Sequence, residues 1–243
     1  DNLGAVVDEK ILTHFAEKNE PFLMEVCPRT EMDRKGGHLA QTHEGQLLLR
    51  ETAQCPDNEV EHFQDINRYQ YFNTNNLWVS LRALKQKLYE HNNLLPLSLI
   101  LNSKEVEEEK VYQIESAMGA AISVFKGSKA IVVNKDRFIP VKKTNDLLAI
   151  WSDAFELTKE YKLKLNNSFG KTPGIKFNDR YYRTIDQLQE HFKDGIPSLK
   201  KCNTLTIEGN VYFGKHVEII GDVKISKDGI LEYCLLMNEE ITK

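Results

Sequence analysis

The sequence predicts an α/β domain followed by a parallel β-helix. Apolar strands alternate with helical patterns between residues 7 and 156, which is typical of helices packed on a mixed sheet. An apolar period of six residues then runs from residue 205 to residue 225, and a short sustained period indicates the stacked coils of a solenoid. We therefore expect an α/β domain over residues 1–160. Residues 161–243 hold a linker, a short helix and the β-helix.

The composition is that of an ordinary globular protein, with 41% hydrophobic and 28% charged residues among 243. A net charge of −4 without a long basic run argues against nucleic acid or an anionic membrane as a partner. No apolar run is long enough to cross a bilayer. The cysteines are too scattered for a disulfide framework or a zinc motif, so we expect a reducing, cytoplasmic location. They are Cys27, Cys55, Cys202 and Cys234.

The elements of the first domain follow from their apolar spacing. Ile11, Leu12 and Phe15 have helical spacing. Pro28 ends the buried strand that we expect at residues 22–26. Residues 111–125 begin extended and become helical, and Gly119 within them indicates close helix packing. The other expected strands and helices are 22–26, 46–50, 95–101 and 130–133 as strands, and 7–18, 77–88 and 146–156 as helices.

The second part begins with residues 164–176, which are polar and contain Gly and Pro, as a linker does. Thr184 and Gln187 have the spacing of a capping box that opens a short helix. An ordinary meander is the alternative for the tail, but it would not keep a six-residue period through four cycles. The repeating apolar positions are Leu205, Val211, Val217 and Val223, then Ile207, Phe213, Ile219 and Ile225, with Gly209 and Gly221 at turns.

Residues 137–142 (RFIPVK) place a lysine directly after a stiff extended segment. Pro140 fixes one backbone angle and favours an extended residue before it. A compact ammonium held in this way suits phosphate oxygens, so Lys142 is a candidate catalytic residue. Alternatively, Lys142 is an ordinary solvated lysine.

Residues 72–76 place three asparagines and a threonine beside Phe72. Carboxamides both donate and accept hydrogen bonds, which suits sugar hydroxyls, and the ring offers a flat apolar face. The alternative is structural, because Asn75 or Asn76 could cap a helix that begins at Leu77.

Four further residues each have a functional and a structural interpretation. Asp1 could hold Mg²⁺ or precede a helix, and Gly36 could let backbone approach a ligand or form a tight turn. Glu51 follows a strand, where ligands meet α/β sheets, or it caps the loop before Pro56. Phe138 could line a pocket or belong to the core.

Taken together, these segments resemble the eukaryotic-type UTP–glucose-1-phosphate uridylyltransferase family, also called UDP-glucose pyrophosphorylases. The likeness extends in order along the chain. The matching segments are residues 1–5 (DNLGA), 24–26 (MEV), 35–37 (KGG), 72–78 (FNTNNLW), 115–122 and 137–148, with the carboxyl-terminal coils.

The resemblance implies a Rossmann-like nucleotidyltransferase domain with a mixed sheet, followed by a left-handed β-helix. It implies a magnesium-dependent reaction that forms UDP-glucose and pyrophosphate from UTP and glucose 1-phosphate. By the same resemblance, Asp1 binds Mg²⁺ and Lys142 contacts the reacting phosphates. The residues expected to hold or wall the sugar are Gly36, Glu51, Phe72, Asn75 and Phe138.

The family's glycine-rich nucleotide loop, its companion lysine and its uracil-binding segments are not in this sequence. We therefore expect the chain to be the carboxyl-terminal portion of such an enzyme, inactive without its amino-terminal half. A second copy could also pair through the β-helix. The alternatives are a pyrophosphorylase for UDP-N-acetylglucosamine or a broad range of UDP-sugars, and a non-catalytic β-helix assembly module.

Overall fold

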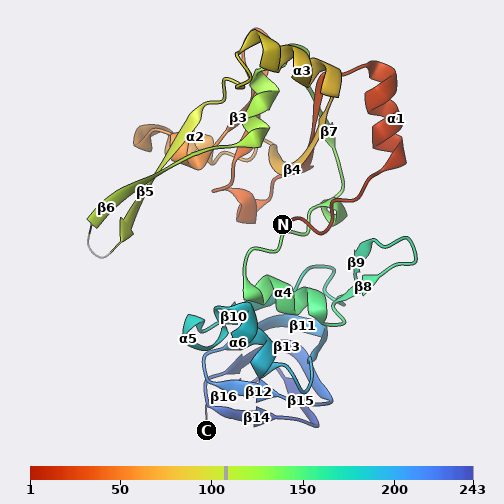
Figure 1. Cartoon of the computed structure of the whole chain (residues 1–243). Helices are drawn as coiled ribbons and strands as arrows, with labels where there is room; N and C mark the ends of the chain where they lie inside the picture. Colours follow the sequence, from red (N-terminus) through yellow and green to blue (C-terminus); the bar gives the residue numbers. More distant parts are fainter. Residues whose placement is uncertain (107–108, 243) are drawn as a thin grey trace. The chain divides into compact units, whose positions relative to one another are not determined.

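The chain divides into two units, whose elements are labelled in Figure 1. The computed structural model describes residues 1–106 and 109–242. Unit 1 comprises residues 1–6 and 136–243, and unit 2 comprises residues 7–135. The sequence placed a boundary near residue 160 instead. The difference arises because α4 (Thr144–Trp151) buries Leu148 and Ala149 in the same apolar core as the carboxyl-terminal coils.

Unit 2 contains a five-stranded mixed sheet with the order β3-β2-β4-β1-β7. Its strand β1 pairs antiparallel with β4 and parallel with β7, which confirms the predicted α/β class. The strands of the unit are β1 (Phe22–Pro28), β2 (His38–Gln41), β3 (Leu47–Arg50), β4 (Tyr71–Val79), β5 (Leu99–Val106), β6 (Glu109–Ser116) and β7 (Lys129–Val132), and its α-helices are α1 (Glu9–Lys18), α2 (Val60–Phe63) and α3 (Leu81–Glu90).

The helix expected from residue 77 begins later. Residues 71–79 form the single strand β4, because Leu77 pairs with Met24 of β1 and continues the sheet. Helix α3 begins only at Leu81, where the Ser80 hydroxyl accepts from the helix backbone. The prediction that Asn75 or Asn76 caps a helix is therefore wrong.

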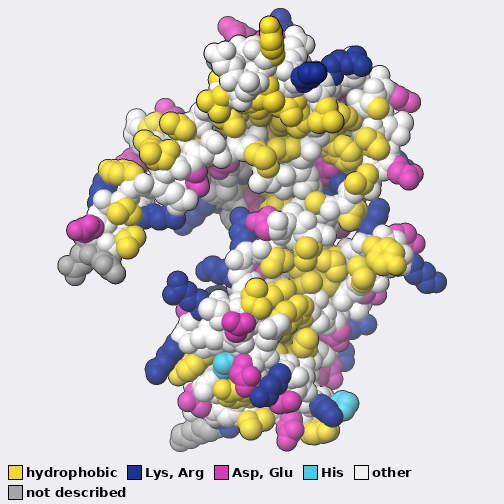
Figure 2. Space-filling view, viewed as in Figure 1, with side chains coloured by type: hydrophobic (Ala, Val, Ile, Leu, Met, Phe, Trp, Pro, Cys, Tyr) yellow, Lys and Arg dark blue, Asp and Glu magenta, His cyan; other side chains and the backbone are white. Residues whose placement is uncertain are grey.

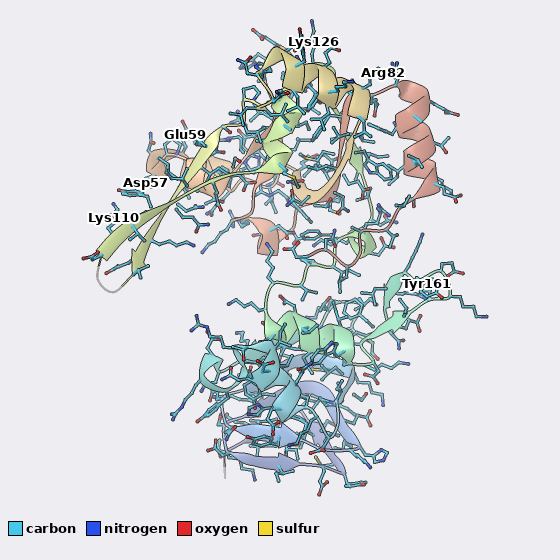
Figure 3. All side chains as sticks on the ribbon, in the orientation of Figure 1. Asp57, Glu59, Arg82, Lys110, Lys126 and Tyr161 are labelled. Carbon is cyan, nitrogen blue, oxygen red and sulfur yellow. The ribbon has the colours of Figure 1, made fainter. Side chains whose placement is uncertain are left out.

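A long hairpin of β5 and β6 projects from the sheet of unit 2 (Figure 1). One face carries apolar side chains such as Leu101 and Ile114, which are 55% and 66% exposed, and Figure 2 shows hydrophobic surface along the hairpin. Near the tip, the Lys110 ammonium (Figure 3) lies 5.4 Å from the ring centroid of Tyr112. The helical part of residues 111–125 is a 3-10 helix, Met118–Ser123.

Unit 1 is built mainly from parallel strands stacked in coils, beside one antiparallel pair, β8 and β9. Residue 205 of one strand pairs with residue 223 of the next, and residue 211 pairs with residue 229, so the coil between them comprises three six-residue repeats. The strands are β8 (Phe155–Leu157), β9 (Leu163–Leu165), β10 (Gly174–Phe177), β11 (Ser198–Ile207), β12 (Val211–Phe213), β13 (Val217–Ile225), β14 (Gly229–Leu231), β15 (Cys234–Met237) and β16 (Glu240–Ile241), and the remaining helices are α5 (Asp179–Tyr182) and α6 (Ile185–His191).

The repeating apolar positions face the interior of these coils. All eight predicted inward residues, from Leu205 to Ile225, are at most 3% exposed, so the six-residue period is a packing period. The two turn glycines serve different purposes. Gly221 has φ +69°, which a side chain disfavours, whereas a Cβ on Gly209 would collide with the carbonyl of Lys227 in the next coil.

Residues 164–176, which the sequence predicts to be a linker, contain regular secondary structure. The expected linker at 164–176 overlaps strands β9 and β10. The predicted capping box is confirmed, because Thr184 and Gln187 exchange hydrogen bonds at the start of α6. None of the helices within residues 1–106 and 109–242 combines the length and apolar character needed to cross a membrane.

Candidate active site

The first residues of the chain dock on the segment 137–142, and both lie in unit 1. The Asn2 side chain donates from Nδ2 to the Arg137 carbonyl at 2.9 Å and accepts from Ile139 N at 2.7 Å. A Cβ on Gly4 would lie 2.6 Å from the carbonyl oxygen of Asp136, directly before this segment, so a larger residue could not approach so closely. The motifs DNLG and RFIPVK, which are far apart in the sequence, thus form one structural element.

The backbone around Lys142 is held on both sides. Val141 N donates to the carbonyl of Asp1 at 2.7 Å. The amides of Lys142 and Lys143 both donate to Oδ2 of Asp146, at 2.9 and 3.0 Å. The Lys142 side chain is exposed, and no ion pair is recorded for it among the described residues. The structure therefore presents Lys142 from a restrained backbone, as the position of Pro140 predicts.

The carbonyl of Asp1 accepts the hydrogen bond from Val141 N, so Asp1 lies next to the segment that carries Lys142. Asp1 is exposed. No group of three or more His, Cys, Asp or Glu that could enclose a metal occurs in residues 1–106 and 109–242. Mg²⁺ does not need such a group, because it usually binds one or two carboxylates, water and substrate phosphates. A single accessible carboxylate next to an exposed lysine is compatible with that mode.

In unit 2, a buried carboxylate organises a bulge in β4. Three residues of β4, 74–76, lie opposite the single residue Glu25 of β1, where the strand register shifts. Glu25 is fully buried. Its two carboxylate oxygens accept from Asn76 Nδ2 at 3.1 Å and Trp78 Nε1 at 2.8 Å. The Thr74 hydroxyl donates to the Glu25 carbonyl at 2.8 Å, so the bulge is held by both side chain and backbone.

The bulge presents Asn75 to solvent. Asn75 has φ +63°, a left-handed conformation that asparagine tolerates better than most residues. The Asn73 side chain accepts from Asn75 N at 2.8 Å and donates to Asn75 Oδ1 at 3.3 Å. A Cβ on Gly119 would lie 2.8 Å from Asn73 Nδ2, which confirms the close packing expected at this glycine. Asn75 is thus an exposed carboxamide with a defined orientation.

The ends of β2, β3 and β4 bring other predicted sugar residues together. His38 of β2 is the register partner of Arg50 in β3 and of Phe72 in β4. A Cβ on Gly37 would collide with the carboxylate of Glu51. The glycine pair therefore leaves room for Glu51, which was the least constrained prediction from the sequence.

The remaining predicted residues are distributed between the units. Around Gly36 there is space, since a Cβ there would meet only one backbone oxygen, at 3.4 Å. Phe72 is buried, and the Lys135 ammonium lies 5.9 Å from its ring centroid. Unit 2 holds Gly36, Glu51, Phe72 and Asn75, and unit 1 holds Asp1, Phe138 and Lys142.

Sequence reasoning missed two residues that support this site. The buried Arg29 side chain donates to the carbonyls of Arg34 at 2.7 Å and Tyr69 at 3.1 Å, and so fixes the loop before Gly36. Burial lowers the pKa of Arg29. An arginine that follows an apolar strand resembles a surface residue, so no sequence signal distinguishes it.

His38 was also missed. Its ring is buried, with centroids 4.4 Å from Phe63 and 4.1 Å from Tyr69, and its Nε2 atom has no hydrogen-bond partner within the described part of the chain. Burial, reinforced by the charges of Arg29 and Arg50, lowers the pKa of His38 to about 4. His38 is therefore neutral at pH 7, and it supports the strands as an aromatic side chain.

Comparisons with known proteins show which family the chain matches. The family described as UTP–glucose-1-phosphate uridylyltransferase matches residues 1–220. A relative of that name from Musa acuminata is 40% identical over 95% of this chain and 49% of its own length. One from Saccharomyces cerevisiae is 41% identical over 93% of this chain and 45% of its own length. The chain thus spans about half the length of the curated relatives it matches.

Solved structures show the same likeness. A variant of UDP-glucose pyrophosphorylase from Leishmania major, in complex with UDP-glucose, has a TM-score of 0.80 and 39% identity, covering 99% of this chain and 55% of its own. A UDP-glucose phosphorylase from Trypanosoma brucei has a TM-score of 0.80 and 43% identity, covering 99% of this chain and 54% of its own.

We predict that Glu25→Gln lowers the free energy of unfolding by about 2 kcal/mol. A glutamine offers one acceptor oxygen in place of two, so either Asn76 or Trp78 would lose its partner and face another donor. Urea unfolding at pH 7 measures the loss. Glu9→Gln, at the exposed start of α1, removes the same charge from the same unit and should change stability by less than about 0.5 kcal/mol. Equal effects of the two substitutions would contradict the role of Glu25.

His38 makes stability depend on pH. The pKa of His38 is lower in the folded protein than in the unfolded chain, so its stabilising effect is complete above about pH 6.5 and declines as the pH falls toward 4. We expect unfolding free energy to fall by about 2 to 3 kcal/mol from this residue alone between pH 7 and pH 4. His38→Phe, which keeps an aromatic ring, should remove that part of the loss. If the unfolding free energies of the unchanged protein and of His38→Phe fell in parallel between pH 7 and pH 4, this role of His38 would be refuted.

Proposed function

The chain belongs to the UTP–glucose-1-phosphate uridylyltransferase family, and we propose that the protein carrying it joins UTP and glucose 1-phosphate to give UDP-glucose and pyrophosphate. The observation that supports this most directly is the docking of DNLG on RFIPVK in unit 1. In this docked arrangement Asp1, which is proposed to hold the metal, contacts through its carbonyl the residue next to Lys142, which is proposed to contact the reacting phosphates. The whole protein's activity is a proposal, because the chain spans about half of its relatives.

Unit 2 is proposed to bind the sugar. The exposed carboxamide of Asn75 can donate and accept hydrogen bonds, and the carboxylate of Glu51 can accept them, which suits hydroxyl groups. Gly36 provides space for a close approach, and Phe72 is proposed to form an apolar wall. The rigid bulge around Glu25 favours this assignment, since a preorganised polar group loses less conformational entropy on binding.

Unit 1 is proposed to bind the reacting phosphates. In the reaction, a phosphate oxygen of glucose 1-phosphate attacks the α-phosphorus of UTP, and the bond to pyrophosphate breaks. Two unit negative charges at about 4 Å repel by roughly 4 kcal/mol at an effective dielectric constant near 20. The ammonium of Lys142 offsets this repulsion and stabilises charge as it moves to the leaving group. No protein nucleophile is required.

Mg²⁺ is the proposed cofactor, and Asp1 is the residue proposed to hold it. When bound, the ion would add positive charge at the phosphate oxygens. Asp1 and Lys142 would then act on the same phosphates from one restrained segment. Their fixed spacing along the backbone, through the Val141–Asp1 hydrogen bond, supports this pairing.

Several finer features complete the proposal. The nucleotide loop would be supplied by the amino-terminal half of the relatives' length that this chain does not span. The coils of unit 1 would form a left-handed β-helix, through which two copies could associate. The cytoplasm is the proposed location, in keeping with the absence of disulfides among the cysteines, all of which are described.

The alternative substrates are not favoured by the relatives, whose names specify glucose 1-phosphate. Comparing turnover of glucose 1-phosphate with that of N-acetylglucosamine 1-phosphate tests the sugar. A titration with UDP-glucose tests the non-catalytic alternative, because an assembly module would show no saturable binding. Absence of both binding and turnover in the complete protein would overturn the proposed function.

Lys142→Ala should slow turnover of the complete protein about a hundredfold, because roughly 3 kcal/mol of transition-state stabilisation is lost. The measurement is kcat with both substrates saturating. Lys200→Ala removes another exposed lysine of unit 1 and should leave kcat within twofold. Near-normal kcat in the Lys142 variant would refute its catalytic role.

Asn75→Ala should raise the KM for glucose 1-phosphate about tenfold, because one or two hydrogen bonds to the sugar are lost. The KM for UTP should stay within twofold. Asn67→Ala changes an exposed asparagine of the same unit and serves as the control. An effect confined to UTP would contradict the assignment of Asn75 to the sugar.

A further inference from the structure

A pocket of about 590 Å³ opens in unit 1 beside Lys142. It lies where the start of α4, strand β10 and helix α5 meet, and Figure 2 shows Lys and Arg side chains gathered on this side of the unit. Ile175 and Phe177 of β10 supply apolar surface. The polar and charged residues that line it are Lys142, Lys143, Thr144, Asn145, Lys176, Asp179 and Arg183.

The walls of this pocket are tied together by hydrogen bonds between elements. The Thr144 hydroxyl donates to the carbonyl of Tyr182, the last residue of α5, at 2.6 Å. Asn145 Nδ2 donates to the carbonyl of Ile175 in β10 at 3.1 Å. Because both donors come from the first turn of α4, the three elements keep a fixed arrangement, and the pocket is a built feature of the fold.

The residues that line the pocket carry an excess of positive charge. Four cations from three different elements line it together with one carboxylate, Asp179, and no ion pair is recorded for any of the four among the residues that the structure describes. Elsewhere in unit 1 exposed lysines do have such partners, since Lys201 lies 3.0 Å from Glu218 and Lys224 lies 3.0 Å from Glu240. Like charges that converge without partners repel one another, so their convergence favours an anionic ligand.

We propose that this pocket is a subsite for a diphosphate anion, with Lys143, Lys176 and Arg183 as its binding cations. Lysine ammonium groups and the arginine guanidinium are the side chains that best match phosphate oxygens. A diphosphate carries more negative charges than a single phosphate, so it can balance more cations at once. The choice of pyrophosphate rests on the proposed function, in which it is the leaving group next to Lys142. The subsite would hold pyrophosphate as it leaves the phosphate contact at Lys142.

Calorimetric titration with pyrophosphate tests this site without requiring turnover. We expect one binding event in the complete protein, and Lys176→Gln/Arg183→Gln should weaken it at least tenfold. The matched control Lys200→Gln/Lys227→Gln removes two exposed cations of unit 1 that do not line the pocket, and it should weaken binding by less than twofold. Equal weakening by the two double variants would overturn the proposal, since only net charge would then matter. If the first double variant does not fold, Lys176→Gln alone carries the same test.

Inorganic phosphate is the second ligand in this experiment. Binding of phosphate as tight as that of pyrophosphate would overturn the diphosphate assignment. Titration with pyrophosphate is also separable from the proposed function. If the protein binds pyrophosphate in this pocket but forms no UDP-glucose, the proposed function is refuted and the subsite is supported. If the protein turns over but Lys176→Gln/Arg183→Gln binds pyrophosphate as tightly as the unchanged protein, only the subsite is refuted.

Discussion

The part of unit 2 that is proposed to bind the sugar depends on a buried carboxylate. Glu25 is fully buried, and burial of an ionisable group is costly unless hydrogen bonds replace its hydration. Asn76 and Trp78 supply two of those bonds, and β4 can place both donors only by inserting extra residues opposite Glu25. The bulge that results turns Asn75 outward in a left-handed conformation. Satisfying one buried carboxylate thus determines how an exposed amide is displayed.

In unit 1, polar side chains likewise hold the backbone of the segment that is proposed to bind phosphate. The Asn2 carboxamide donates to one carbonyl and accepts from one amide of the segment 137–142, so it pairs with backbone as a neighbouring strand would. The Asp146 carboxylate accepts from two consecutive amides. Neither residue needs to touch a substrate to matter. Both restrain the backbone from which Asp1 and Lys142 project.

The repeat in unit 1 could be predicted from sequence because burial alone determines it. Every sixth residue from Leu205 faces the interior, and a packing period of this kind is written directly in the sequence. The asparagine cluster at 73–76 was harder, because asparagine favours caps, turns and bulges alike. The choice between cap and bulge depended on Glu25, which lies far away in the sequence, so local propensity placed a helix where the sheet required a strand.

The two proposed binding regions, one in each unit, differ in what the fold can prepare in advance. Neutral carboxamides such as Asn73 and Asn75 can satisfy one another without ligand, so a sugar-binding surface can be preorganised at little cost. Cations that must bind phosphate cannot be buried alone, and neighbouring carboxylates would compete with the substrate. The fold therefore leaves Lys142 exposed and restrains only its backbone. Unit 2 thus prepares rigid amides, whereas unit 1 prepares only the backbone from which an exposed cation projects.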